Sequence, residues 1–225
     1  MSDPMRSLSI VDEIGHRLRE AIISGRLAPG EQLVEVDLAE AYNASRNSIR
    51  EVLHLLVRDG LATAVRYRGV FVRVFCEADL QDIYTARRTI QMQAIRSGPA
   101  YTPAVLDKMA AVLQQSRTAM AKEEWQDVGT LSLAFHQVQV SALGSRLIDD
   151  FFLNICAQLR LVFTIAPEER IVQKPMWVER ESLIYELLTQ KRYDAAEAEL
   201  ESYLRDSEEA LTSIVHKYEP NRRFL

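Results

Sequence analysis

Cysteine is scarce in this sequence, and no stretch is long and apolar enough to enter a membrane. The 225 residues include two cysteines, Cys76 and Cys156, whose separation matches no metal-binding spacing. The apolar runs are short and interrupted by charge, and no signal peptide is recognisable. We therefore expect a protein of the reducing cytoplasm, without a membrane span, in which both cysteines are buried thiols.

Lysine is absent from the first third of the chain. Residues 1–75 contain ten arginines and ten acidic residues, whereas residues 76–225 contain 17 basic and 22 acidic residues. The net charge of −5 therefore belongs to the second part. Six arginines lie between Arg46 and Arg73, against two acidic residues, Glu51 and Asp59. This segment can therefore carry a locally positive field, which suits a negatively charged partner.

Residues 45–53 are typical of the start of a helix that faces nucleic acid. Arg46 and Arg50 lie four residues apart, on the face opposite an apolar stripe formed by Ile49, Val52, Leu53 and Leu56. Ser45 and Asn47 suit the capping of a helix N-terminus. The positive end of the helix dipole then points the same way as the two guanidinium groups, an arrangement that fits a phosphate or the edge of a base.

The residues before this helix predict a helix-turn-helix. Residues 33–42 have the apolar periodicity of a short helix, and Asn43-Ala44 supply a tight turn before Ser45. After the second helix, Asp59-Gly60 form a C-terminal cap.

A hairpin follows directly. Residues 61–65 and 70–74 read as two strands, and Arg66, Arg68 and Gly69 lie at the turn between them. Such a hairpin is a wing, suited to a groove or a phosphate backbone. Each piece alone is common, but together in this order they indicate DNA binding.

The run Ile-x-x-Gly-x-Leu-x-Pro-Gly-x-x-Leu at residues 22–33 identifies a family. With it, residues 8–74 resemble the winged helix-turn-helix of the GntR family of bacterial transcription regulators. The resemblance implies DNA contacts from the recognition helix and the wing, namely Ser45, Arg46, Asn47, Ser48, Arg50, Arg66, Arg68 and Gly69. Asn47-Ser48 and Val36 depart from residues that many relatives carry, which concerns the operator sequence and not the DNA-binding role.

Helical periodicity replaces the strand-like alternation near residues 75–78. Six helices are expected, at about 79–97, 103–121, 123–143, 146–164, 175–191 and 193–217. The predicted fold is thus mainly α, with a winged helix-turn-helix domain at residues 1–75 and an antiparallel all-α bundle at residues 76–225.

One arginine of the bundle lies where apolar residues are expected. Arg87 falls on the apolar stripe of helix 79–97, whereas Arg88 points away from it. An unpaired buried charge costs several kcal/mol, so this guanidinium needs a partner. Two interpretations remain open: an internal salt bridge to a glutamate of a neighbouring helix, or a fork that holds a carboxylate ligand.

A polar line of Ser132, His136 and Gln139 runs along helix 123–143. Residues 131–136 resemble the metal-binding helix of the FCD effector domain, which follows the winged helix in the FadR subfamily of GntR regulators. The family's metal site consists of one aspartate and three histidines, and the matching positions here are Ser132, His136, Glu181 and Tyr203.

One of four metal ligands is therefore retained. Hydroxyl groups are weak substitutes for a carboxylate and an imidazole, so we expect a pocket without metal or other cofactor. The alternative is a weakly bound ion, held by His136 and Glu181 with water. The effector pocket expected from the resemblance and from Arg87 consists of Arg87, Ser132, His136, Glu181 and Tyr203.

These patterns predict a homodimeric repressor that binds a palindromic double-stranded operator and responds to a small carboxylate. It would act in the bacterial cytoplasm and lie on the nucleoid when bound to DNA. The alternative is a regulator with a degenerate pocket, without effector or metal. An enzyme that uses His136 and Glu181 as acid and base is disfavoured, because no nucleophile motif, phosphate loop or cofactor fingerprint accompanies them.

Overall fold

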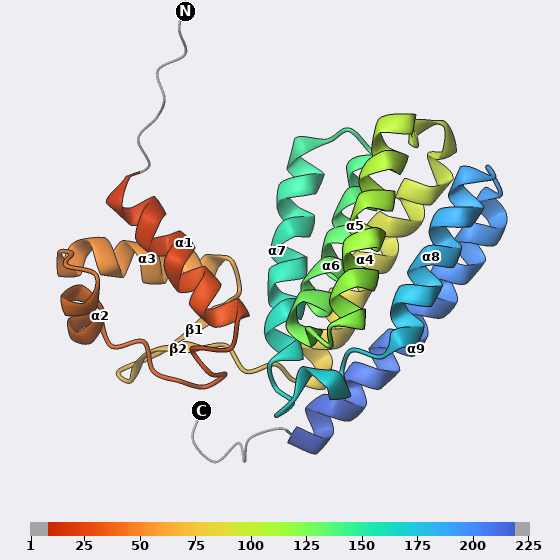
Figure 1. The fold of residues 1–225 in the computed structure, drawn as a ribbon. Helices are drawn as coiled ribbons and strands as arrows, with labels where there is room; N and C mark the ends of the chain where they lie inside the picture. The colour runs from red at the N-terminus through yellow and green to blue at the C-terminus, as the bar shows by residue number, and fades with distance from the viewer. Residues whose placement is uncertain (1–8, 219–225) are drawn as a thin grey trace, which may run out of the picture. The chain divides into compact units, whose positions relative to one another are not determined.

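The structure, a computed structural model, describes residues 9–218, which form two compact units divided between Val74 and Phe75. The first unit contains α1 (Ile10–Ile23), α2 (Glu35–Ala41), α3 (Arg46–Arg58), β1 (Ala62–Val65) and β2 (Gly69–Val72) (Figure 1). The second contains α4 (Glu77–Arg96), η1 (Gly98–Ala100), α5 (Pro103–Ala121), α6 (Trp125–Ser141), α7 (Arg146–Phe163), η2 (Glu169–Ile171), α8 (Pro175–Thr189) and α9 (Tyr193–Tyr218), where η marks a 3-10 turn.

The core of the first unit forms between α1 and α3. A capping box between Ser9 and Asp12 starts α1, because each satisfies a backbone N–H group of the other. Helical spacing then places Ile14, Leu18 and Ile22 on one buried face. This face packs against α3, which also contacts α2. The core thus holds α3 in place from its apolar side.

The wing is a two-stranded antiparallel hairpin in which Val65 pairs with Gly69. Gln32 forms an isolated bridge with Phe71, and the Leu33 N–H donates to the Val70 carbonyl at 2.8 Å. These bonds hold the chain extended before α2. The helix predicted at residues 33–42 therefore begins two residues later, at Glu35.

The second unit is a bundle in which successive long helices run antiparallel (Figure 1). α6 packs against α5 and α7, whereas α9 packs against α4 and α8. Each of the six predicted helices is present within two residues of its expected ends. α4 begins earlier than expected because the Asp79 carboxylate accepts the Cys76 N–H at 2.8 Å. The mainly helical fold class with an N-terminal winged helix is confirmed.

One expectation about the cysteines is wrong. Cys156 is buried, but Cys76 is partly exposed, because it is the N-cap residue of α4 and lies outside the packed helix. No helix within residues 9–218 is long and apolar enough to cross a membrane.

Candidate functional site

The N-terminal end of α3 is open to solvent. Ser45 caps the helix by accepting the Ser48 N–H at 3.1 Å. Ser45, Arg46, Asn47 and Arg50 are exposed and Ser48 is half-buried. The opposite face buries Ile49, Val52, Leu53 and Leu56. Four exposed polar side chains and the positive end of the helix dipole thus share one surface that a phosphate backbone can approach.

Arg50 is oriented by the preceding helix. Its Nε donates to Glu35 Oε2 at 2.8 Å, and both side chains remain solvent-accessible. An exposed pair of this kind contributes little to folding stability, typically under about 1 kcal/mol. Its consequence is positional, since Glu35 limits the directions in which the Arg50 guanidinium points.

The tip of the wing consists of exposed side chains, including an aromatic residue that the sequence analysis passed over. Arg66, Tyr67, Arg68 and Gly69 are all exposed, and Tyr67 is 90% exposed. The Arg66 guanidinium lies 4.7 Å from the centre of the Tyr67 ring. Gln32 braces the tip by donating to the Arg68 carbonyl at 2.9 Å. An aromatic residue between two arginines was the sequence signal for this feature.

The second candidate site lies inside the bundle, around Arg87. This side chain is 2% exposed, its Nε donates to Gln91 Oε1 at 3.2 Å, and its guanidinium lies 5.0 Å from the centre of the Tyr84 ring. Among the described side chains, which do not include that of Glu169, no carboxylate lies at ion-pair distance from it. The internal salt bridge considered from the sequence is therefore not present in the described chain, and a buried positive charge is held by an amide and a ring.

Gln91 links Arg87 to His136. The Gln91 amide nitrogen donates to His136 Nδ1 at 2.7 Å and to Gln139 Oε1 at 2.8 Å. Burial lowers the pKa of His136 well below its ordinary value of 6.5, and the charge of Arg87 lowers it further. A neutral ring whose Nδ1 accepts a hydrogen bond carries its proton on Nε2. His136 Nε2 is buried and has no hydrogen-bond partner in the described chain.

Glu181 completes a polar cluster that consists of Gln91, Ser132, His136, Glu181 and Tyr203 and is joined to Arg87 through Gln91. Its Oε1 accepts hydrogen bonds from Ser132 and from Tyr203, the latter at 3.0 Å, and lies 3.9 Å from His136 Nε2. Burial raises the pKa of Glu181 from 4.5 to about 7, against the opposing effect of these hydrogen bonds. Its Oε2 is buried without a partner among residues 9–218.

The polar cluster therefore offers hydrogen-bond donors to an incoming group. Because Glu181 Oε1 already accepts two hydrogen bonds, a proton on this carboxyl belongs on Oε2. His136 Nε2 is then an N–H donor, and Glu181 Oε2 is an O–H donor while this carboxyl is protonated, which its pKa of about 7 favours below neutral pH. Arg87 adds a positive charge nearby. Donors combined with a buried positive charge match the chemistry of an anion.

The donor set does not suit a tightly held divalent metal ion. The described chain has no group of three His, Cys, Asp or Glu side chains that could ligate one. Ser132 and Tyr203 direct their hydroxyl hydrogens at Glu181, which leaves one imidazole and one carboxylate as suitable ligands.

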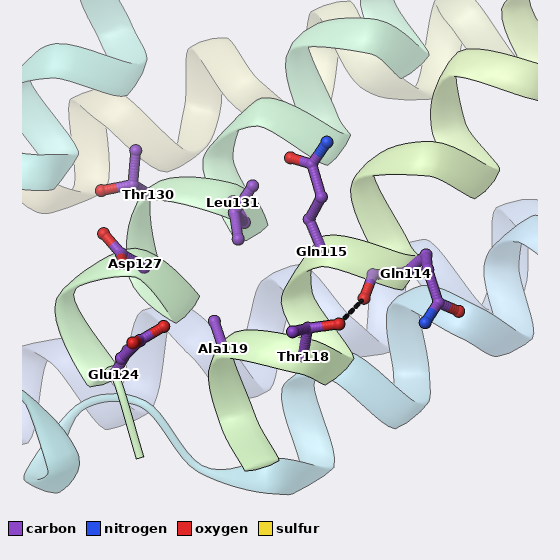
Figure 2. A pocket seen from close by; sticks show the side chains of 8 residues that line it. All are labelled: Gln114, Gln115, Thr118, Ala119, Glu124, Asp127, Thr130 and Leu131. Carbon is purple, nitrogen blue, oxygen red and sulfur yellow. Dashed lines mark hydrogen bonds between the residues drawn. The ribbon is translucent and has the colours of Figure 1, made fainter. Parts of the chain in front are cut away.

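Two hollows in the bundle differ in their relation to the polar cluster. A cavity of about 20 Å³ reaches Ser132 and Tyr203, which is room for about one water molecule. A wider hollow of about 420 Å³ lies between α5 and α6. Figure 2 shows its lining, which contains none of the predicted effector residues but includes Gln114 and Thr118, joined by a hydrogen bond within α5.

The structure brings together Ser132, His136, Glu181 and Tyr203, which come from three helices, and it connects Arg87 to them through Gln91. Sequence reasoning missed Gln91, although it is fully buried. Its position four residues after Arg87 was an available signal, since residues at that spacing are neighbours on a helix face.

We expect wild-type protein to lose stability relative to a Glu181→Gln variant as the pH rises from about 5 to 8. The folded-state pKa of Glu181 is about 7, above the ordinary 4.5, so the folded protein retains a proton that the unfolded chain releases. This stabilisation is complete below pH 4.5 and is lost as the pH rises through 7. At about 1.4 kcal/mol per pH unit, the loss approaches roughly 3 kcal/mol.

Urea unfolding of both proteins at several pH values measures this difference. Glutamine preserves the size of the side chain, and His136 titrates in both proteins, so the difference reports on Glu181. A difference in unfolding free energy that does not change with pH would show that Glu181 keeps an ordinary pKa.

Comparison with known proteins assigns both units to families. The model of the bacterial regulatory proteins of the gntR family matches residues 10–72, and the FCD domain model matches residues 82–206. The crystal structure of a GntR transcriptional regulator from Rhodococcus sp. RHA1 is 31% identical, with a TM-score of 0.83, over 91% of this chain and 98% of that one.

Two curated relatives are named as repressors. HTH-type transcriptional repressor RspR of Escherichia coli K12 is 26% identical over 199 residues, which is 88% of this chain and 86% of that protein. HTH-type transcriptional repressor GlaR of the same strain is 29% identical over 191 residues, which is 82% of this chain and 81% of that protein. With the matched family models, these similarities show that the chain belongs to the GntR family of DNA-binding transcription regulators and carries an FCD effector-binding domain.

Proposed function

We propose that this regulator is a repressor, and that it binds a palindromic operator as a homodimer in the bacterial cytoplasm. The repressor role is supported by the relatives named RspR and GlaR. A dimer is expected because one short recognition helix contacts few base pairs, whereas a two-fold symmetric dimer contacts twice as many in a palindromic operator.

We further propose that a small carboxylate held by Arg87 changes the affinity for DNA. The observation that carries this proposal is the buried Arg87 guanidinium, which has no carboxylate partner among the described side chains. His136 and Tyr203 serve as neutral hydrogen-bonding partners, and Ser132 and Glu181 form the opposite wall. A carboxylate is the group that a guanidinium fork binds best.

One observation favours a second function, that of a regulator without a small-molecule effector. The cavity beside Ser132 and Tyr203 holds about 20 Å³, so a carboxylate must displace a side chain to enter. A thermal-shift screen of carboxylated metabolites separates the two functions, because a ligand bound only by the folded protein raises its melting temperature.

Catalysis is not part of the proposal. Ser132 donates to the Glu181 carboxylate and makes no hydrogen bond to His136 within the described chain. A serine nucleophile is activated by a base that accepts its proton, and this arrangement lacks that contact.

The DNA-binding surface predicts different outcomes for α3 and for the wing. Arg46→Ala should weaken operator binding by roughly 1–3 kcal/mol and relax sequence preference, because an arginine that reads base edges is lost. Arg68→Ala should weaken all sequences alike and reduce the salt dependence, because a phosphate contact is lost. Binding isotherms on operator and scrambled duplexes at several salt concentrations measure both. Equal losses on both duplexes for Arg46→Ala would assign Arg46 to a phosphate.

The ligand set of the polar cluster predicts weak metal binding. Elemental analysis of purified protein should find well under one equivalent of zinc, nickel or manganese, and a chelator should leave the melting temperature and the DNA affinity unchanged. The reason is that His136 and Glu181 supply too few ligands for a firmly held ion. A stoichiometric ion that survives dialysis would disprove this expectation.

The anchor role predicts that Arg87→Met abolishes the ligand-induced change in DNA affinity and leaves ligand-free DNA binding nearly intact. Methionine preserves much of the length of the side chain but removes the charge. DNA binding is titrated with and without the carboxylate that scores highest in the thermal-shift screen. Because the two binding events are linked, wild type should show one coupling factor whichever partner is added first.

The matched control is Arg88→Met, which removes the neighbouring arginine. Arg88 forms ion pairs with Glu201 and Glu208, at 3.1 and 3.0 Å, and should not affect the ligand response. If Arg87→Met folds poorly and binds DNA badly without ligand, Arg87 has a structural role and is not the anchor.

A further inference from the structure

Two hollows of the bundle meet at a single side chain, that of Gln173. The outer hollow, about 530 Å³, opens to solvent and is lined by Met120, Trp125, Arg170, Gln173 and Lys174 among others. The inner cavity is the one of about 20 Å³ beside Ser132 and Tyr203, and Gln173 and Trp177 line it as well. Gln173 therefore lines both the solvent-open hollow and the cavity beside the polar cluster.

The Gln173 side chain is buried but weakly held. It is 3% exposed, and within residues 9–218 its carboxamide makes no hydrogen bond. Because no described residue hydrogen-bonds this carboxamide, its outward rotation breaks no hydrogen bond within the protein.

Gly129 of α6 makes room for this amide. A Cβ at position 129 would lie 2.9 Å from Gln173 Nε2, which is too close for packed atoms, and 3.2 Å from both Gln173 Cδ and Phe163 Cδ2, which is tight. The buried position of the amide thus depends on a glycine at this point of α6.

The outer hollow carries the charge that an anion requires. Arg170 and Lys174 are exposed at its rim, and the described residues of its lining include one carboxylate, that of Glu123. A positive rim raises the local concentration of anions and the rate at which they enter. The indole of Trp125 adds an apolar wall to the same hollow.

The inner cavity touches both ends of the polar cluster. Ser132 and Tyr203 contact Glu181 from one side. On the other side, Ser207 lines the cavity and shares a hydrogen bond of 2.6 Å with the Tyr84 hydroxyl, and the Tyr84 ring lies beneath Arg87. A ligand that displaced Gln173 would therefore arrive among these groups.

We propose that the outer hollow is the entrance by which a small organic anion reaches the polar cluster, and that Gln173 is its gate. Outward rotation of the Gln173 side chain joins the two hollows, and Arg170 and Lys174 select anions at the mouth. This inference rests on the proposed function for the class of ligand, whereas the path itself can be tested without a natural effector.

The test measures access to an introduced thiol at the inner cavity. Ser132→Cys is combined with Cys76→Ser and Cys156→Ala, which remove the native thiols. The probes are sulfonatoethyl and trimethylammonioethyl methanethiosulfonate, one anionic and one cationic. In each reaction the thiolate attacks the sulfenyl sulfur, a mixed disulfide forms and methanesulfinate leaves. Rates are followed by mass spectrometry and divided by those with a free small thiol.

Opening the gate should accelerate labelling. In the Ser132→Cys background, Gln173→Ala should raise both rates by at least about tenfold, because the accessible state no longer requires a displaced side chain. Gly129→Ala should also raise them, because its methyl group expels the amide from its place on α6. Circular dichroism and the melting temperature verify that each variant is folded. Unchanged rates in both folded variants would overturn the role of Gln173.

Reversing the charge at the mouth of the outer hollow should change the ratio of the labelling rates of the anionic and cationic probes, without lowering both rates together. Arg170→Glu with Lys174→Glu should lower the anion-to-cation rate ratio by about tenfold. The matched control is Lys108→Glu, an exposed lysine twelve residues before Met120 on α5 and about 18 Å away along the helix. A ratio that shifts equally in the control would overturn the assignment of the outer hollow as the entrance.

The outcomes separate the entrance from the effector. If Gln173→Ala accelerates labelling but no carboxylate raises the melting temperature, the entrance stands and the effector proposal fails. If carboxylates act through Arg87 but the labelling rates do not change in the Gln173 and Arg170/Lys174 variants, the entrance proposal is wrong and the effector proposal stands.

Discussion

The burial of one guanidinium constrains the interior of the FCD domain. Arg87 lies inside the bundle at 2% exposure and is stabilised by an amide and an aromatic ring instead of a carboxylate. A buried positive charge demands polar neighbours, and these neighbours, from Gln91 to Glu181, run through α4, α6, α8 and α9. Hydrogen-bonded polar side chains therefore occupy part of the interior that apolar side chains could otherwise fill.

The same charge accounts for the protonation states nearby. It disfavours a second positive charge and so helps to keep His136 neutral, while burial keeps the Glu181 pKa near 7. Outside the bundle the electrostatics are ordinary, since Arg88 pairs with Glu201 and Glu208, and Arg180 pairs with Glu199 and Asp206. α9 connects the two environments, because Tyr203 and Ser207 face inward on a helix whose glutamates form ion pairs outside.

The winged helix follows a different physical rule. The apolar stripes of α1 and α3 are buried against each other. The candidate DNA-binding surface is formed by the residues that remain exposed, at the α3 N-terminus and the hairpin tip. Local contacts refine this surface, since Glu35 orients Arg50 and Gln32 braces the carbonyl of Arg68. The DNA-binding surface is thus built from short-range bonds, whereas the polar cluster depends on helices far apart in sequence.

That difference separates what the sequence determined from what only the tertiary structure decided. Periodicity, caps and turn residues are local, so they identified the helices, the hairpin and the exposed arginines, and the interior position of Arg87 followed from its place on an apolar stripe. Helix ends shifted by up to two residues where a nearby bond intervened, as at Asp79 and at Leu33. Only the tertiary structure showed which residues contact Arg87 and which atoms of His136 and Glu181 have no hydrogen-bond partner. It also showed that Gln173 lines two hollows. These features depend on distances across the bundle, between residues as far apart as 123 positions for Tyr84 and Ser207, which no local pattern encodes.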